Sequence, residues 1–258
     1  MTLAVLMVDG LDHRYAVRFR SLRLRHCGTY PVDVRRNSVQ LWASFLTGRE
    51  VDFDEFVVKR FRWLPYRPIA PLVRWRPRHF FRAPSFRGET FIDEVERALA
   101  VNVFCYNEAP ESLEFRVRNS IPRLLSRGLD ARARAVRERV ELERRLFGQF
   151  VEALSAGGYE LGVTYLRLVD DANHLLGSPL PYYPVVARMV DRLLRAVRCD
   201  VLIVSDHGGR GGRHTPDAHW ASTVELPREP ESVTGWRDII LGLLRSHSAT
   251  GAPDAADL

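Results

Sequence analysis

Four short runs of apolar residues, separated by longer stretches of helical character, constrain the fold of this chain most strongly. The runs are rich in Val, Leu and Ile and occupy residues 3–8, 100–105, 161–169 and 200–205. Continuous apolar character over so few residues predicts strands that are buried on both faces, as in a parallel sheet. We therefore predict an α/β fold, with a doubly wound, mostly parallel sheet and helices on both faces.

The segments between the runs predict helices. The clearest helix spans residues 130–156, where Ala, Leu, Val and Phe recur among Arg and Glu. Asp130 is a suitable N-terminal cap, and Gly157-Gly158 supplies the stop. Shorter helices are expected over residues 183–197 and 236–244. This alternation of strands and helices supports the doubly wound arrangement.

The length of 258 residues and the 46% hydrophobic content suit one domain with its own core. We expect that domain to span residues 1–245 and to be followed by a disordered tail over residues 246–258. Residues 49–90 differ in composition from the rest of the chain, because prolines interrupt helices and arginines alternate with aromatic residues. They predict either a lid that holds an anion and stacks a base, or a connecting excursion whose arginines are merely solvated.

The net charge of +6 comes almost entirely from arginine, since Lys59 is the one lysine among 38 basic residues. Genome composition alone explains such a bias, although guanidinium groups also suit bidentate contacts with oxyanions. The pI of about 9.6 permits nucleic acid or anionic ligands without identifying either. Charge alone therefore leaves the class of ligand open.

The cysteines and the apolar segments bear on location. Cys27, Cys105 and Cys199 are odd in number and far apart, which favours a reducing, cytoplasmic compartment over a disulfide framework. The N-terminal run has no basic region before it and stops at Asp9, so we expect a first strand and not a signal peptide. No segment approaches the roughly 18 apolar residues of a spanning helix, so we expect no membrane contact.

Three of the apolar runs end in an aspartate, at Asp9, Asp170 and Asp206. Each alone is most simply a turn or capping residue. Together they favour a site, because the carboxyl ends of parallel strands meet at one edge of a sheet, where ligands bind. Carboxylates and imidazoles at such an edge are the ligands that divalent metals require.

Histidines accompany these aspartates. His174 follows Asp170 by four residues, which brings both side chains to one face of a helical turn, although Asp171 competes for the same role. His207 follows Asp206 directly, and the glycines after it permit the sharp turn that would aim both side chains inward. His214 lies just beyond this glycine-rich loop. His13 and His219 have no comparable context and are expected to be surface or structural histidines.

A short apolar helix is expected after Arg36-Asn37-Ser38, with Gly48 as its stop. Ser38 would lie at the N-terminus of this helix. It is either an ordinary N-terminal cap or a hydroxyl aimed at metals, with the amides beside it binding a phosphoryl oxygen.

The ordered set of motifs resembles the alkaline phosphatase superfamily, in its type I phosphodiesterase/nucleotide pyrophosphatase branch. The resemblance runs from Asp9 to about Ser222. Its marks are Val8-Asp9-Gly10, Ser38 four residues before Trp42-Ala-Ser-Phe-Leu-Thr-Gly, Asp170-x-x-x-His174, Ser205-Asp206-His207-Gly208, and His214-Thr-Pro-Asp-Ala-His-Trp.

The resemblance implies an alkaline phosphatase-like core and a site for two divalent metals, usually zinc, with manganese and iron as alternatives. One ion would be held by Asp170, His174 and His214, and the other by Asp9, Asp206, His207 and Ser38. Ser38 would be the nucleophile, giving a covalent phosphoryl- or nucleotidyl-serine that water then hydrolyses. Asn37 and nearby amides are candidates for contacts with the non-bridging oxygens.

The chain departs from the family pattern at several places. Nucleophiles in this branch are more often Thr and are often followed by proline, whereas Val39 follows Ser38 here. The loop from His207 to His214 leaves little room for the large insertion of many relatives. No third-metal motif is present, and this absence favours diesters or pyrophosphates over monoesters.

A phosphomonoesterase of the same superfamily remains an alternative, as does a non-catalytic, arginine-rich nucleic-acid-binding protein with a structural metal site. The Ser38 segment lacks the nucleophile pattern of a sulfatase, and the length of the chain disfavours a phosphomutase, which needs an extra domain. The resemblance thus implies a small phosphorylated or nucleotide substrate in preference to nucleic acid.

Overall fold

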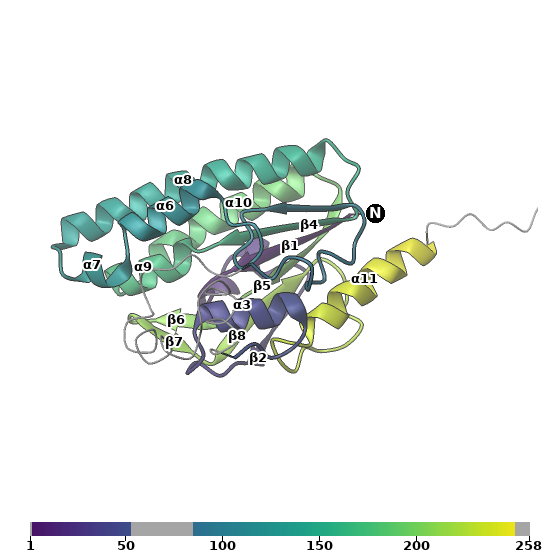
Figure 1. Cartoon of the computed structure of the whole chain (residues 1–258), viewed down its shortest axis with the longest axis horizontal. Coiled ribbons are helices and arrows are strands. Elements are labelled where there is room, and N and C mark those ends of the chain that lie inside the picture. The colour runs from purple at the N-terminus through teal and green to yellow at the C-terminus, as the bar shows by residue number, and fades with distance from the viewer. Residues whose placement is uncertain (1, 53–84, 251–258) are drawn as a thin grey trace, which may run out of the picture.

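The computed structural model describes residues 2–52 and 85–250 and contains a six-stranded sheet with the order β2-β8-β5-β1-β4-β3 (Figure 1). Neighbouring strands β3, β4, β1 and β5 are parallel, and β8 pairs antiparallel with both β5 and β2. The predicted α/β class with a mostly parallel sheet is therefore confirmed. The strands are β1 (Thr2–Val8), β2 (His26–Pro31), β3 (Ala98–Val101), β4 (Leu161–Leu166), β5 (Cys199–Val204) and β8 (Asp217–Ser222).

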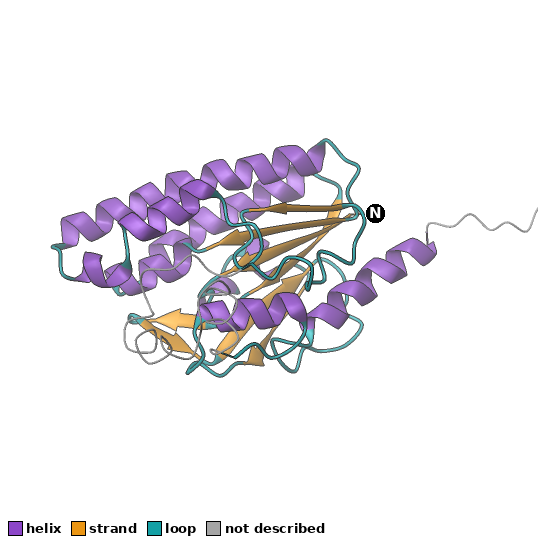
Figure 2. Ribbon diagram, in the orientation of Figure 1, coloured by secondary structure: helices purple, strands orange, loops and turns teal. Residues whose placement is uncertain are grey.

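Helices cover both faces of this sheet (Figure 2). In the central strand β1, Ala4, Leu6 and Val8 belong to one buried cluster, whereas the alternate residues belong to the other. The first cluster includes α8 (Leu129–Ser155), α9 (Leu168–Leu176) and α10 (Tyr183–Ala196), and the second includes α3 (Ser38–Thr47) and α11 (Trp236–Thr250). The remaining helices of the described residues are α1 (His13–Ala16), α2 (Arg20–Arg23), α6 (Pro110–Arg118), α7 (Ile121–Leu125) and the 3-10 turn Leu180–Tyr182.

The boundaries of two predicted elements differ from the expectation. The N-terminal cap of α8 is Gly128, and Asp130 lies instead in the first turn, where its charge complements the helix dipole. The strand expected over residues 100–105 is β3, which ends at Val101 because Asn102 adopts a left-handed φ of 54° and its side chain accepts a hydrogen bond from the Ala109 amide.

The sequence did not predict β2 and β8, because neither segment forms a continuous apolar run. It also did not predict the two-stranded hairpin of β6 (Gly208–Arg210) and β7 (Arg213–Thr215), which rises from the end of the sheet. Both strands of the hairpin are only three residues long. The hairpin nevertheless carries His214 and therefore decides where that side chain lies.

Other predictions fall wholly or partly outside the described residues. Most of the basic and aromatic segment 49–90, namely residues 53–84, lies outside them, as do residues 251–258 of the expected tail. Helix α11 continues to Thr250, beyond the predicted end at residue 244. Across residues 2–52 and 85–250, no helix has the length and apolar character needed to cross a membrane.

Candidate metal and nucleophile site

The polar residues after three neighbouring strands meet at one edge of the sheet. Asp9 follows β1, Asp206 follows β5 on one side, and Asp170 lies in the first turn of the helix after β4 on the other side. All three carboxylates are buried. The close approach also depends on Gly10, which has a φ of 72° and where an added Cβ would lie 3.0 Å from Cβ of Asp170.

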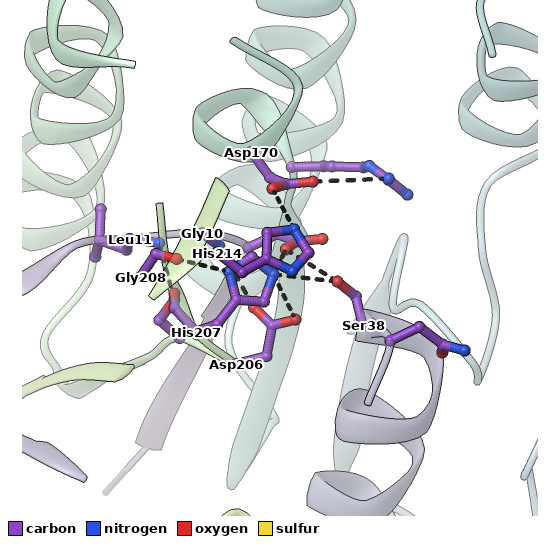
Figure 3. A network of polar contacts seen from close by, with 12 residues as sticks. Gly10, Leu11, Ser38, Asp170, Asp206, His207, Gly208 and His214 are labelled. Carbon is purple, nitrogen blue, oxygen red and sulfur yellow. Dashed lines mark hydrogen bonds and ion pairs between the residues drawn. The ribbon is translucent and has the colours of Figure 1, made fainter. Parts of the chain in front are cut away.

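The first group of side chains surrounds His207. Its Nε2 atom lies 3.2 Å from Oδ1 of Asp9 and 3.4 Å from Oδ2 of Asp206. The hydroxyl oxygen of Ser38 lies 3.2 Å from the same nitrogen and 3.5 Å from Oδ1 of Asp9. Figure 3 shows Ser38 at the end of its helix, facing His207.

The orientation of the His207 ring suits a ligand. Its Nδ1 lies 3.0 Å from the carbonyl oxygen of Gly208, which can only accept a hydrogen bond, so Nδ1 carries a proton. In the neutral ring Nε2 therefore has a free lone pair, and that atom faces Asp9, Asp206 and Ser38. A backbone carbonyl that fixes the tautomer in this way is a common partner of metal-binding histidines.

The second group consists of Asp170, His174 and His214. Helix α9 places His174 one turn after Asp170, with Nε2 of His174 3.2 Å from Oδ1 of Asp170. The hairpin brings Nε2 of His214 to 3.6 Å from the same oxygen and to 2.8 Å from Nε2 of His174. The rings of His214 and His207 are stacked, with centroids 3.7 Å apart, so the two groups adjoin.

These residues fit divalent cations. Among the described residues, two sets of ligand atoms lie within 4.8 Å of one another: Asp170, His174 and His214, and Asp9, Asp170 and His207. Oδ1 of Asp170 and Oδ2 of Asp206 are buried without a hydrogen-bond partner. Buried polar atoms are rarely left in this state, and both face the imidazoles described above. Mixed carboxylate and imidazole donors are those that zinc and similar ions take.

The electrostatics of the site agree with this fit. Burial raises the pKa of Asp206 well above its usual range, and the charges of Asp9 and Asp170 raise it further. Burial opposes ionisation of Asp170 too, but contacts with His174 and His214 hold its pKa well below the usual range. Burial alone would lower the pKa of His207, whereas the carboxylates of Asp206 and Asp9 raise it to about 10. A bound cation would offset this excess of buried negative charge in place of protons.

Ser38 is not the cap of its helix. Asn37 occupies that position, and its side-chain oxygen accepts a hydrogen bond from the amide of Gln40, whose own side chain accepts from the Asn37 amide. This capping box leaves the Ser38 hydroxyl free to face Asp9 and His207. The same contacts engage the side-chain oxygen of Asn37 in the cap of the helix, next to Ser38.

Asp171 does not join the ligand atoms. Its carboxylate accepts hydrogen bonds from Nε of Arg139 at 2.8 Å and Nε of Arg167 at 3.1 Å. Arg167 also extends toward Asp170, with Nη2 3.8 Å from Oδ2. Asp171 is therefore engaged by two arginines, whereas Asp170 faces the imidazoles of His174 and His214.

His13 and His219 also lie apart from this group of ligands. His219 is buried, and its ring contacts the Leu22 carbonyl and His13. The expectation that both are surface or structural histidines agrees with these contacts.

Sequence reasoning assigned no role to Tyr165 and did not consider Asn173. The Tyr165 hydroxyl donates to Oδ2 of Asp9 at 2.5 Å, which leaves Oδ1 facing His207. Tyr165 lies near the end of a buried strand. In the sequence, its position five residues before Asp170 was the one signal that it belongs to the site. Asn173 had no such signal, because its partners lie on the hairpin.

Comparison with known proteins gives structural similarities only. No family model matches the chain, and no curated protein is similar to it. One similar solved structure is the PH0037 protein of Pyrococcus horikoshii, with a TM-score of 0.45, 11% identity, and coverage of 99% of this chain and 98% of that one. Another is alkaline phosphatase from the Antarctic bacterium TAB5, with a TM-score of 0.44, 10% identity, and coverage of 95% and 97%.

Murine ectonucleotide pyrophosphatase/phosphodiesterase 5, solved as an inactive variant with AMP, gives a TM-score of 0.42 at 11% identity. That alignment covers 81% of this chain and 57% of the murine one. The similar structures thus include an alkaline phosphatase and a nucleotide pyrophosphatase/phosphodiesterase, the groups that the sequence motifs resemble.

Proposed function

We propose that this protein is a metal-dependent hydrolase of phosphodiester or nucleotide pyrophosphate bonds, acting through a covalent intermediate on Ser38. One observation carries the proposal: the Ser38 hydroxyl faces Asp9 and His207 at a buried cluster of carboxylates and imidazoles, two of whose oxygens accept no hydrogen bond from the described residues. A serine in that position has the surroundings of an activated nucleophile.

Two groups of residues would each hold one cation. Asp9, Asp206 and His207, with Ser38, would hold one, and Asp170, His174 and His214 would hold the other. When bound, two such cations would lower the pKa of the attacking hydroxyl and stabilise charge on the departing oxygen. Zinc suits this mixed carboxylate and imidazole set, and manganese or iron are the alternatives.

The protein residues supply position and charge for an in-line displacement. A bond forms between Oγ of Ser38 and phosphorus, and the bond from phosphorus to the leaving oxygen breaks. Water then attacks the phosphorus and frees the serine, releasing the phosphate product. The first turn of α3 presents backbone N–H groups that have no carbonyl partner within the helix, and these suit the non-bridging oxygens. The exposed Asn37 side chain is a further candidate for that contact.

A preference for diesters or pyrophosphates over monoesters follows from the sequence, which has no third-metal motif of the kind that a magnesium-assisted monoesterase requires. The preferred substrate is therefore a small diester or nucleotide pyrophosphate. The alternative of a non-catalytic nucleic-acid binder depended on residues 49–90, most of which lie outside the described residues.

Location in the cytoplasm remains part of the proposal. Cys27, Cys105 and Cys199 are all free thiols, as in proteins of reducing compartments.

Hydrolysis of bis-p-nitrophenyl phosphate, with p-nitrophenyl phosphate as the monoester, tests the proposal. We expect turnover of the diester to exceed that of the monoester, to stop with a chelator and to return with zinc. Ser38→Ala should abolish turnover, while Ser85→Ala, which changes an exposed serine whose hydrogen bonds are with Tyr106 and Arg87, should retain it. Undiminished turnover by Ser38→Ala would remove Ser38 as the nucleophile, and activity on the monoester alone would contradict the substrate class.

A further inference from the structure

Asn173 is a fully buried polar residue that the proposed mechanism does not use. It precedes His174 on α9, and its side chain extends to the β6–β7 hairpin. Its Nδ2 donates to the carbonyl of Arg213 at 3.2 Å, and its Oδ1 accepts from the amide of Gly212 at 3.0 Å. Both polar groups of one side chain thus bind the backbone immediately before His214.

Besides Asn173, Asp12 also contacts the hairpin, through an ion pair with Arg210 at 2.8 Å and a hydrogen bond from the Thr215 hydroxyl at 3.5 Å. The strands of the hairpin are three residues long, and a two-residue turn at Gly211 and Gly212, with φ of 58° and 76°, joins them. An isolated hairpin of this size is at best marginally stable in water, so its placement depends on packing against other elements.

The hairpin fits closely against Asn173. Gly209 pairs with His214 across the two strands, and an added Cβ at Gly209 would lie only 2.9 Å from Nδ2 of Asn173 and 3.2 Å from the Gly10 carbonyl. Without a side chain at Gly209, the hairpin backbone can approach the amide of Asn173. The hairpin therefore contacts Asn173 through close packing at Gly209 as well as through two hydrogen bonds.

We propose that Asn173 is a positioning residue that sets His214 against His174 and so completes the Asp170, His174 and His214 ligand set. The inference rests on the proposed function, since it concerns one of the two metal groups assigned there. Residues 173 and 174 are adjacent on α9, and the atoms that Asn173 holds are adjacent to His214. One side chain therefore fixes the relative position of two ligands that come from different elements. Their Nε2 atoms lie 2.8 Å apart.

A purely structural role for Asn173 makes a different prediction, and Asn107 supplies the matched control. The Asn107 side chain makes the same pair of bonds, donating to the Ala100 carbonyl at 2.8 Å and accepting from the Val103 amide at 3.0 Å. It does so in the loop after β3 and contacts none of the proposed ligands. Asn107→Leu should lower the melting temperature without affecting the metal group.

The test uses Co²⁺ as a spectroscopic probe on the full-length, metal-stripped protein. Visible absorption of bound Co²⁺ reports the number and geometry of its ligands, which a change in stability alone does not alter. We expect Asn173→Leu to weaken Co²⁺ binding by about 10- to 100-fold, the usual effect of removing a residue that orients a ligand. Its spectrum should move toward that of His214→Ala, whereas Asn107→Leu should match the wild type in both affinity and spectrum.

Each outcome decides a separate point. If Asn173→Leu does not fold by circular dichroism, Asn173→Ala, which removes the same bonds without adding bulk, is measured in its place. Wild-type affinity and spectrum in the folded Asn173 variant would overturn the positioning role and leave the proposed function intact. Failure of the wild-type protein to bind Co²⁺ would overturn the metal site of the proposed function and, with it, this inference.

Discussion

At the scale of single residues, burial gives His219 a pH-dependent contribution to stability. Burial lowers the pKa of His219 to about 4, because the charged ring cannot be hydrated there. In the unfolded chain its pKa is near the ordinary value of about 6.5. Between these values the unfolded state binds a proton and the folded state does not, so stability is retained above pH of about 6.5 and falls as the pH decreases toward 4.

We expect this residue to cost about 2 kcal/mol of stability on going from pH 7.5 to pH 5. Urea unfolding at the two pH values, with chelator present throughout, measures the change. His219→Gln should lose less stability than the wild type over that interval, since it has no ring to protonate. Equal losses in the two proteins would show that His219 is not the titrating group.

A second prediction at the residue scale concerns Tyr165. Tyr165→Phe removes the donor to Oδ2 of Asp9 and leaves a buried carboxylate oxygen without its partner. Such a loss costs about 1–3 kcal/mol. We expect chemical denaturation to show that decrease in metal-free protein. No change in the free energy of unfolding would mean that Asp9 does not depend on this hydroxyl.

At the scale of elements, a buried ion pair joins α8 to α9 behind the metal ligands. The pair consists of Arg139 and Asp171, which lie 2.8 Å apart with side chains that are 2% and 7% exposed. Arg139→Leu should destabilise the protein by about 3 kcal/mol, because it leaves Asp171 with Arg167 alone. The double variant Arg139→Leu/Asp171→Leu should recover part of that loss in urea unfolding. A double variant that is less stable than Arg139→Leu would contradict the burial argument.

Some strands of the sheet could be predicted from the sequence, and others could not. The apolar runs of β1, β4 and β5 could be identified because strands buried on both faces have no polar positions, and the aspartates after them marked the site. Strands β2 and β8 could not be identified in this way, since polar and apolar residues mix in both. The contacts of Tyr165 and Asn173 join elements that are distant in sequence, so no local pattern reveals the partners of these side chains.

At the scale of the whole molecule, metal binding should stabilise the fold, because the ligands come from β1, β5, α9 and the β6–β7 hairpin and an unfolded chain does not bring them together. An ion present at 100 times its dissociation constant adds about 2.7 kcal/mol. For a chain of this size that corresponds to a rise in melting temperature of about 5–10 °C. Thermal unfolding with and without chelator should show this difference. Equal melting temperatures would contradict binding at the described site.

The central claim, that Ser38 attacks phosphorus at this site, is tested most directly by mass spectrometry of the intermediate. Protein quenched in acid during turnover of bis-p-nitrophenyl phosphate should carry a p-nitrophenylphosphoryl adduct on the peptide that contains Ser38, because attack on the diester releases one p-nitrophenolate and retains the other aryl group. The adduct should disappear with chelator and in Ser38→Ala, together with the hydrolysis. Metal-dependent hydrolysis that continues in Ser38→Ala, with no adduct on the wild-type peptide, would contradict the claim.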